Sequence, residues 1–347
     1  MATVKEVARR AGVSLGTVSN VLNRPEVVSE QLRTRVQQAI DELGFVRNES
    51  ARQLRAGVSR TIAMVVLDVA NPFFTDVIAG AEELAEQHDA LVVMCNSANS
   101  AEREARHLHR LDQQRVLGVL LTPVSGAPTA ALRDVRAHGT PLVLVDRVAA
   151  VPEHPSVAVD DVLGGRLAGE HLLGAGHRRI AFVGVPPGLR QVDDRRDGLR
   201  SAAGGDVVDV HSSGMSVRAG SQAAARLLGD PPATRATAVF CANDLLALGV
   251  LNECVRRGVR VPDDLAIVGY DDIGFAATAS VPLTSVRQPR QLLGRTAVEL
   301  LLAQVEGRPA QQVVFEPELV VRRSTSRRSR APALTVPADR GGGAGGT

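Results

Sequence analysis

Short β-rich runs alternate with helical stretches through most of this 347-residue chain, from Arg60 onward. Such alternation predicts parallel sheets covered by helices on both faces. Eight runs of this kind over about 210 residues predict two doubly wound α/β lobes in tandem and not one sheet. The expected strands are Thr61–Asp68, Ala90–Asn96, Val116–Leu121, Pro141–Val145, Ile180–Gly184, Val207–His211, Ala236–Phe240 and Leu265–Gly269.

Two kinds of site lack their sequence signatures in this chain. No G-x-G-x-x-G motif and no Walker loop follows an expected strand, so a nucleotide-using enzyme loses its main support. Cys95, Cys241 and Cys254 are scattered, without C-x-x-C or histidine-rich spacing, which indicates neither a disulfide framework nor a zinc site. We therefore expect no cofactor and no metal ion.

The N-terminal region is typical of three short helices. Thr3 begins a capping box at the first helix, and Ser14 and Ser29 stand where they can cap the second and third. Gly12 and Gly44 stand where left-handed residues would end the first and third helices. Apolar residues recur at helical spacing in all three: Val4, Val7, Ala8, Ala11, Val18, Val21, Leu22, Leu32, Val36, Ile40 and Leu43.

The second helix has an outward face that favours DNA binding. Leu15, Gly16, Ser19 and Asn20 point away from its apolar stripe. A short turn between two tightly packed helices, with the second helix free on one side, is the arrangement that reads bases in a major groove. A small helical bundle with a structural or protein-docking role is the alternative.

Charge is distributed unevenly along the chain. Residues 1–60 contain ten basic and six acidic residues, a net charge of +4, and residues 322–347 carry +5. The stretch between them, 61–321, carries −7. Basic ends on an acidic body suit a phosphate-binding head attached to a module that need not touch DNA.

The head resembles that of the lactose-repressor (LacI/GalR-type) family. The similar segments are Val4-Lys-Glu-Val-Ala-Arg-Arg-Ala-Gly-Val-Ser14, Thr17-Val-Ser-Asn-Val-Leu-Asn23 and Leu43-Gly-Phe-Val-Arg-Asn-Glu-Ser-Ala-Arg-Gln-Leu-Arg55. The resemblance implies that positions 15, 16 and 20 read bases, and that five polar residues lie along phosphates: Thr3, Ser14, Ser19, Asn23 and Ser29. Asn20, where Arg or His is frequent, and Gly16, which has no side chain, depart from common members and leave the operator sequence open.

The same resemblance implies a hinge helix at residues 48–56 that folds on DNA. Leu54 would be wedged into the minor groove beside the Leu54 of a second subunit, and such a wedge unstacks a base step and kinks the duplex. A linker with some helical propensity is the alternative for this segment.

Polar and aromatic residues follow the carboxyl ends of the expected strands, where open parallel sheets bind ligands. The polar groups include acceptors, forked donors and amides, which together can grip adjacent hydroxyls, and the aromatic pair offers an apolar face to a sugar ring. The candidates are Asn71, Phe73, Phe74, Asp146, Arg147, Arg195, Asn243, Asp271 and Gln288. Other interpretations are that Asp244 and Asp272 are helix N-caps, that Asp146 and Arg147 form a local ion pair, and that Phe73 and Phe74 belong to the core.

The body is similar to the type I periplasmic-binding-protein fold that accompanies such heads, up to about Thr325. The resemblance implies that those nine candidates are effector positions, and their identities are closest to those of ribose-type members. Met215 stands where such relatives often place an aromatic residue that stacks on the sugar.

Charge counting within the candidate pocket favours a neutral effector. Arg147 and Arg195 balance Asp146 and Asp271, whereas a sugar phosphate would need surplus basic groups. Two aspartates could suggest a glycosidase, but each stands beside a group that would keep it ionised, and a general acid needs a raised pKa. We expect no enzymatic activity.

We expect four segments: a head at residues 1–47 with its motif at about 4–23, a hinge helix and linker at 48–60, an effector-binding and dimerisation body at 61–325, and a disordered tail at 326–347. Lobe 1 is expected at 61–159 plus 289–310, and lobe 2 at 160–287 plus 311–322.

These features predict a cytoplasmic repressor that binds a palindromic operator as a homodimer and responds to a small sugar, with no membrane partner. A regulator of the same fold controlled by a protein partner or by a non-sugar effector is the alternative. A sugar-transport binding protein is a further class, which the head and the missing signal peptide disfavour.

Overall fold

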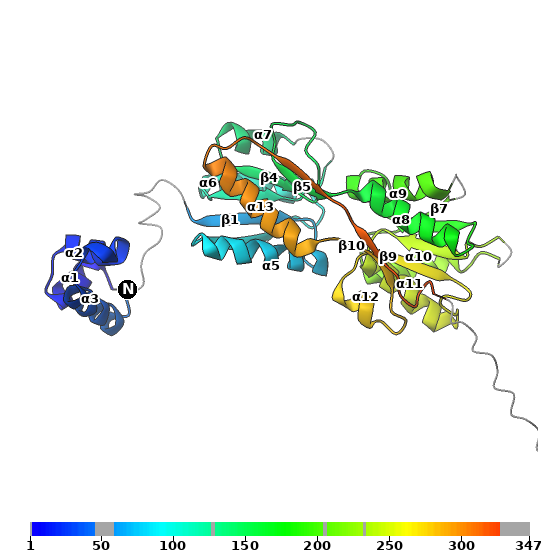
Figure 1. Cartoon of the computed structure of the whole chain (residues 1–347), viewed down its shortest axis with the longest axis horizontal. Helices are drawn as coiled ribbons and strands as arrows, with labels where there is room; N and C mark the ends of the chain where they lie inside the picture. The colour runs from blue at the N-terminus through cyan, green and yellow to red at the C-terminus, as the bar shows by residue number, and fades with distance from the viewer. Residues whose placement is uncertain (1, 46–58, 126–128, 204–206, 232–233, 327–347) are drawn as a thin grey trace, which may run out of the picture. The chain divides into compact units, whose positions relative to one another are not determined.

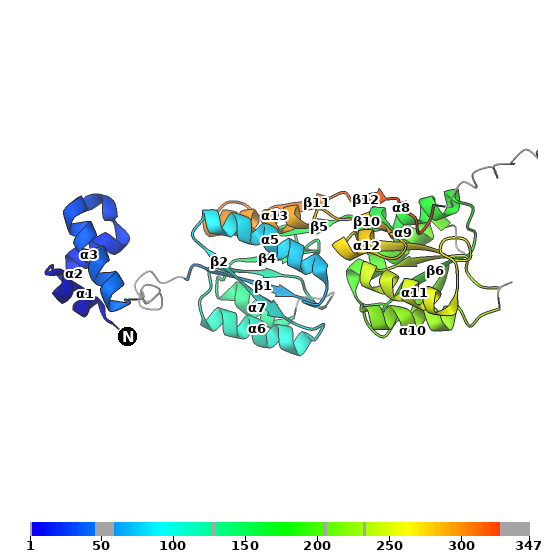
Figure 2. The same ribbon diagram turned by 90° about the horizontal axis from the view of Figure 1, so that it is seen from below.

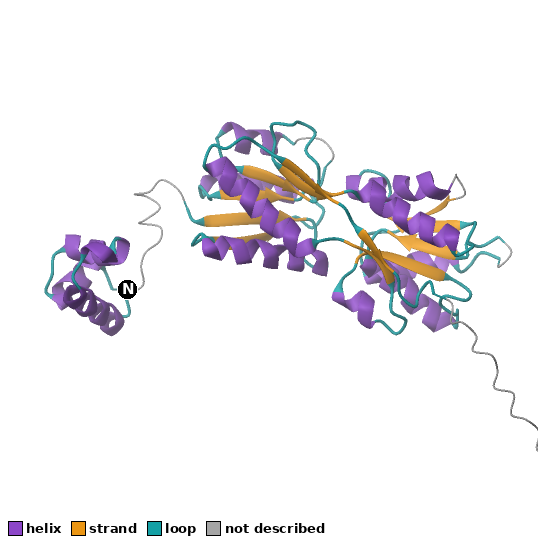
Figure 3. Cartoon of the chain, viewed as in Figure 1, coloured by secondary structure: helices purple, strands orange, loops and turns teal. Residues whose placement is uncertain are grey.

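The computed structural model describes residues 2–45, 59–125, 129–203, 207–231 and 234–326. The chain divides into two compact units with the boundary between Ser59 and Arg60. Figure 3 shows that the first unit is helical and that the second combines helices with strands. The expected hinge helix with Leu54, and the expected tail apart from Ser326, lie outside the described residues.

The head contains α1 (Val4–Ala11), α2 (Leu15–Asn23), a short 3-10 helix η1 (Pro25–Val27) and α3 (Glu30–Leu43). The predicted capping box is present, because the Glu6 amide donates to Thr3 Oγ1 and the Thr3 amide to Glu6 Oε2. Ser14 caps α2 by accepting from Thr17 N at 3.0 Å. Ser29 stands at the N-cap of α3 without a side-chain cap bond.

A small apolar core holds the three helices together. Val7, Val18 and Val36 contribute one fully buried side chain from each helix. Ala39 is buried on α3, whereas Leu43 is exposed, so the apolar stripe of α3 ends one turn earlier than its spacing predicted.

Two six-stranded sheets form the body, as the alternation predicted. The first has the order β11-β5-β4-β3-β1-β2 and is parallel throughout. Its strands are β1 (Thr61–Val66), β2 (Leu91–Asn96), β3 (Gly118–Leu121), β4 (Leu142–Val145), β5 (Ser156–Val159) and β11 (Gln312–Phe315).

The second sheet has the order β12-β10-β9-β8-β6-β7 and is parallel except for the edge strand β12. Its strands are β6 (Ile180–Gly184), β7 (Val207–His211), β8 (Ala238–Cys241), β9 (Ala266–Asp271), β10 (Thr284–Arg287) and β12 (Glu318–Val320). Four of the twelve described strands, β5, β10, β11 and β12, were not among the eight expected.

Helices cover both faces of each sheet (Figure 2). In the first lobe α5 (Pro72–Gln87) and α13 (Arg290–Val305) lie on one face, and α6 (Ala101–Gln113) and α7 (Ala130–Ala137) on the other. The second lobe has α8 (Asp161–Gly174) and α9 (Arg190–Ala203) on one face and α10 (Val217–Leu227) and α11 (Asp244–Arg257) on the other, with a short α12 (Gly274–Thr278). Because both faces are buried, β1 is apolar from Ile62 to Val66: Ile62 and Met64 pack under α5 and α13, while Ala63 and Val65 face α6 and α7.

The chain crosses between the lobes three times: after β5, between β10 and α13, and between β11 and β12 (Figure 1). The expectation that residues 311–322 belong to the second lobe is therefore wrong for β11. This strand pairs with β5 in the first sheet, with Gln312 opposite Ser156 and Phe315 opposite Val159. The pairing covers the ladder edge that β5 would otherwise expose.

Helices α5 and α13 meet backbone to backbone. A Cβ atom added to Gly294 would lie 1.7 Å from the carbonyl oxygen of Val77, and one added to Gly80 would lie 1.9 Å from that of Gln291. Glycine is therefore required at both positions for the two helices to pack at this distance.

Candidate functional site

The outward face of α2 is the first candidate site. Val18 is fully buried in the head core, so the opposite side of the helix is turned outward. Leu15, Gly16 and Asn20 are exposed and Ser19 is half-buried. The outward orientation that the sequence predicted for this face is confirmed, and the face presents an amide and an apolar side chain to solvent.

The five residues expected along phosphates, Thr3, Ser14, Ser19, Asn23 and Ser29, are exposed except for the half-buried Ser19. Asn23 Nδ2 donates to the Ser19 carbonyl at 2.8 Å and contacts Ser19 Oγ at 3.2 Å, so these two side chains are held together at the end of α2. Ser14 Oγ lies 2.9 Å from Thr17 Oγ1.

A cavity between the two lobes of the body is the second candidate site. It encloses about 50 Å³ where the carboxyl ends of strands from both sheets come together. Its lining consists of Leu67, Asp68, Asn71, Phe73, Phe74, Asn99, Asp146, Leu189, Gln191, Val192, Arg195, Met215, Asn243 and Asp271.

Seven of the nine expected effector positions line this cavity, and Arg147 and Gln288 do not. Arg147 Nη1 donates to the Ser125 carbonyl at 2.8 Å. Gln288 Nε2 donates to Asp271 Oδ1 at 2.8 Å, so Gln288 supports a lining residue without lining the cavity itself.

Asn71 has two roles at the first-lobe side of the cavity. Its Oδ1 accepts from the Phe73 amide at 3.1 Å and caps α5, while its Nδ2 donates across the lobes to Asp271 Oδ2 at 3.2 Å. Phe73 and Phe74 meet edge to face with ring centres 5.0 Å apart. Both rings belong to the first-lobe core and to the cavity lining, so the core interpretation and the ligand interpretation are compatible.

Asp146 forms the second contact across the lobes, with Gln191 as its partner. It adopts a left-handed φ of 58° directly after β4, and it lines the cavity, whereas its neighbour Arg147 does not. Gln191 Nε2 donates to Asp146 Oδ2 at 3.2 Å, and neither Asp146 Oδ1 nor Gln191 Oε1 has a hydrogen-bond partner among the described residues. Burial, followed by the charge of Asp161, raises the pKa of Asp146 to about 8.

Arg195 is the cation at the second-lobe side. Its Nε donates to Asp161 Oδ1 at 2.8 Å, its Nη1 donates to the Ala242 carbonyl at 2.7 Å, and its guanidinium lies 3.7 Å from the ring centre of Tyr270. Asp271 Oδ1 is 3.9 Å from Nη1. Burial opposes the charge of Arg195, but the surrounding acidic groups, Asp161 first, raise its pKa above the ordinary value.

The balanced charge expected for the pocket is therefore wrong. Asp68, Asp146 and Asp271 line the cavity with Arg195 as the one cation of the lining, and Arg147 lies outside it, so acidic side chains outnumber basic ones. Burial raises the pKa of Asp161 and of Asp271 as well. The arrangement can accept several hydrogen bonds and disfavours an anion.

Sequence reasoning missed Asp161 and Gln191. Asp161 begins α8 directly after β5, a strand of four residues that was not predicted, so its place at a strand end was not recognised. Gln191 is one turn ahead of the predicted Arg195 on α9, and this spacing is the signal that could have identified it.

The N-cap interpretation of Asp244 and Asp272 is wrong. The N-cap of α11 is Asn243, whose Oδ1 accepts from the Leu246 amide, and Asp244 accepts instead from Ser285 Oγ at 2.7 Å. The carboxylate of Asp272 is bound by Arg287 and Arg322 in ion pairs.

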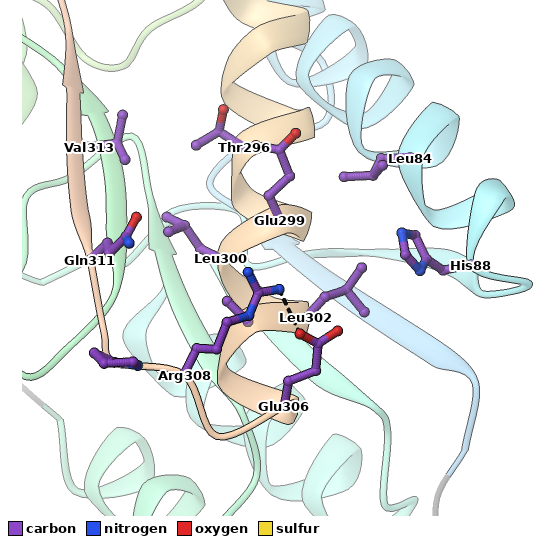
Figure 4. A pocket seen from close by; sticks show the side chains of 12 residues that line it. Leu84, His88, Thr296, Glu299, Leu300, Leu302, Glu306, Arg308, Gln311 and Val313 are labelled. Atoms are coloured by element: carbon purple, nitrogen blue, oxygen red, sulfur yellow. Dashed lines mark ion pairs between the residues drawn. The ribbon is translucent and has the colours of Figure 1, made fainter.

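A separate cavity of about 450 Å³ lies on the first lobe, between α5, α13 and the segment before β11 (Figure 4). Its walls include Leu84, Leu300 and Val313. Arg308 and Glu306, both half-exposed, form an ion pair at 2.7 Å in this wall. It is roomier than the interlobe cavity, but its polar groups do not converge on a common point, so the interlobe cavity is the better candidate.

In the ranges that the structure describes, no helix is both long and apolar enough to cross a membrane. The same residues contain no cluster of three or more His, Cys, Asp or Glu side chains placed to hold a metal ion.

Comparisons with known proteins agree with this geometry. Residues 3–48 match the model of bacterial regulatory proteins of the lacI family, and residues 170–325 match a periplasmic binding protein-like domain. The chain is 33% identical over 337 residues to the HTH-type transcriptional repressor PurR of Photobacterium profundum, covering 93% of this chain and 98% of that protein.

Two solved structures are similar along most of their length. The lac repressor dimer bound to operator and the anti-inducer ONPF shares 28% identity at a TM-score of 0.81, covering 94% of this chain and 99% of that one. A LacI family transcriptional regulator from Enterococcus faecium with bound ribose shares 28% identity at a TM-score of 0.69, covering 77% of this chain and 98% of that one. With its helix-turn-helix head and two-lobed α/β body, the chain belongs to the lacI family of bacterial regulatory proteins.

Proposed function

We propose that this chain is a cytoplasmic transcriptional repressor that binds a palindromic operator as a homodimer and is controlled by a small neutral sugar of pentose type. The exposed face of α2 supports the DNA-binding part, with Leu15, Gly16 and Asn20 at base edges. Thr3, Ser14, Ser19, Asn23 and Ser29 contact phosphates, and Leu54 acts from the hinge at 48–56. One three-helix head has too few contacts for specific affinity, so two heads act together, as in the operator-bound lac repressor dimer.

The observation that carries the effector proposal is the pair of hydrogen bonds between the lobes. Asn71 and Asp146 belong to the first lobe, and their partners Asp271 and Gln191 belong to the second. Unpartnered oxygens on Asp146 and Gln191 can accept hydrogen bonds from hydroxyl groups of a ligand held between the lobes. The rings of Phe73 and Phe74 supply an apolar wall for the CH face of a sugar.

The charges around the cavity restrict the class of effector. Arg195, the one cation among the lining residues, already pairs with Asp161 and Asp271, so it is not a surplus cation of the kind that a phosphorylated sugar would need. The proposed effector set also includes Asn243 as a lining amide, Gln288 as the residue that orients Asp271, and Arg147, which does not line the cavity in this structure. The similarity to a ribose-bound regulator supports a pentose as the effector.

Ligand control then follows from the two-lobed geometry. A cavity of about 50 Å³ is far smaller than the few hundred Å³ usual for a ligand site, so the lobes must separate to admit the sugar and close on it afterwards. An effector gripped by both lobes favours one lobe arrangement, and only such differential affinity can shift operator binding. The coupling is reciprocal, so operator changes sugar affinity by the same factor.

The test begins with a palindromic operator selected from random duplexes by the full-length protein. Sugars, including pentoses, a disaccharide and a sugar phosphate, are then screened by thermal shift, since a ligand of the folded state raises its stability. Operator is titrated with and without the best pentose, using wild type and Asp271→Ala. We expect the variant to keep basal operator binding and to lose the sugar response. A wild type whose operator affinity no sugar alters would contradict the proposal, and a response only to the disaccharide or to the sugar phosphate would transfer it to another effector class.

A further inference from the structure

Arg290 joins the two lobes through a single guanidinium. It is the first residue of α13, at the crossing that leads from β10 in the second lobe to the first lobe. Its Nε donates to Asp76 Oδ2 on α5 at 2.7 Å. Its Nη1 donates to the Asp272 carbonyl at 2.6 Å and to the Asp271 carbonyl, both at the end of β9. A rigid planar fork is suited to fixing three acceptors in one geometry.

The backbone that Arg290 contacts has an uncommon conformation. Asp271 and Asp272 have φ values of 96° and 51°, in the left-handed region that residues other than glycine seldom adopt. Arg287 and Arg322 bind the carboxylate of Asp272, with Nε of Arg287 at 2.7 Å and Nη1 of Arg322 at 2.5 Å. These arginines hold the backbone of Asp271 and Asp272 in place without lining the cavity. That backbone directs the Asp271 side chain into the interlobe cavity.

Helix α5 carries Asp76. Its N-cap Asn71, five residues before Asp76, donates to the Asp271 carboxylate. Arg290 therefore fixes both ends of the contact between Asn71 and Asp271 without being among the residues that line the cavity. We infer that Arg290 is a positioning residue that sets the lobe arrangement in which Asn71 and Asp271 grip one effector. This inference rests on the proposed effector site and adds the residue that prepares it.

The consequence is a dependence of effector affinity on a residue that does not touch the effector. Without Arg290 the two lobes sample other arrangements, and the fraction of molecules with a competent cavity falls. The apparent dissociation constant rises in inverse proportion to that fraction.

A matched control lies on the same two helices. Arg295 on α13 and Glu83 on α5 form an exposed ion pair at 3.3 Å, five residues further along α13 than Arg290. This pair joins α13 to α5, as Arg290 and Asp76 do, but both of its members belong to the first lobe. Arg295→Gln removes a comparable contact within the first lobe and leaves the connection between the lobes intact.

The first measurement is calorimetric titration of full-length protein with D-ribose. We expect Arg290→Gln to raise the dissociation constant about tenfold, Asp76→Asn to raise it less, and the double variant to match Arg290→Gln, since both act through one contact. Arg295→Gln should stay within about twofold of wild type. Equal effects of Arg290→Gln and Arg295→Gln would overturn the inference, because helix packing alone would then explain them.

The second measurement needs no ligand and separates this inference from the proposed function. Spin labels are attached to cysteines introduced at the exposed positions Asp134 on α7 and Arg218 on α10, in a Cys95→Ser background. The distribution of distances between the labels should broaden in Arg290→Gln and in Asp76→Asn, and should match wild type in Arg295→Gln. Unchanged distributions in both Arg290→Gln and Asp76→Asn would overturn the inference. If wild type fails to bind D-ribose while the distributions broaden, the pentose proposal fails and the role of Arg290 stands.

Discussion

Gln191 of the second lobe donates to Asp146 of the first, with 3.2 Å between Nε2 and Oδ2. Each of these side chains keeps one oxygen without a partner in the described residues. A buried acceptor without a donor is unfavourable, and a ligand hydroxyl that supplies the missing hydrogen bond is correspondingly stabilised. The contact therefore connects the two lobes and leaves two acceptors free for the effector that we propose.

The stability of the ligand-free protein should depend on pH through Asp146. Burial raises the pKa of its carboxyl to about 8, the charges of Asp161 and Asp271 add to this, and Arg195 and Gln191 oppose it. In the unfolded chain the group ionises near its ordinary value of 3.8, so between the two values the folded state holds the extra proton. Stability from this group is greatest at low pH and declines as pH rises, by up to about 1.4 kcal/mol per pH unit.

Urea unfolding of wild type and Asp146→Asn across about pH 5 to 7.5 measures this effect. The asparagine cannot titrate, so the free energy of unfolding of the variant should fall less steeply as pH rises. Parallel curves for the two proteins would show that Asp146 is ionised in the folded state.

Effector binding should release a proton for the same reason. A hydroxyl that donates to Asp146 favours the ionised carboxylate, so sugar affinity should increase as pH rises toward about 8. Calorimetric titration of the same sugar in phosphate and in Tris buffer at one pH detects the released proton, because the two buffers differ in ionisation enthalpy. Heats that are identical in both buffers would mean that no proton is exchanged.

Gly294→Ala should destabilise the first lobe. The added Cβ would lie 1.7 Å from the Val77 carbonyl oxygen, so α5 and α13 would have to move apart. Overpacking of this kind costs about 1–3 kcal/mol, which urea unfolding resolves. Gly174→Ala is the matched control, because a Cβ at Gly174 near the end of α8 meets nothing within 4 Å and alanine favours helix. A Gly294→Ala variant as stable as wild type would show that the helices separate at little cost.

The sequence predicted both lobes and about half of the cavity lining because strand ends are visible as local patterns. The sequence did not predict the features that depend on which strands pair in the folded protein. Residues 312–315 and 318–320 are two short extended runs with two residues between them, and only their strand partners assign β11 to the first sheet and β12 to the second. Asp146 and Arg147 are adjacent in sequence, but only Asp146 lines the cavity, and Arg147 donates to the Ser125 carbonyl.

Asn20→Ala should weaken specific DNA binding and leave non-specific binding unchanged. Asn20 is exposed on the outward face of α2, where its amide can pair with a base edge in the major groove, and the loss of such a pair costs about 1–3 kcal/mol. Competition titrations with the selected operator and with random duplex, at several salt concentrations, separate the two kinds of binding. The salt slope should stay at its wild-type value, because phosphate contacts determine it.

Asn23→Ala is the control for Asn20→Ala. The Asn23 side chain is held against Ser19 at the end of α2, beside the proposed phosphate positions, and its removal should weaken binding to both duplexes alike. If Asn20→Ala instead weakens operator and random DNA equally, Asn20 contacts the backbone and the sequence preference of this repressor is carried by other residues.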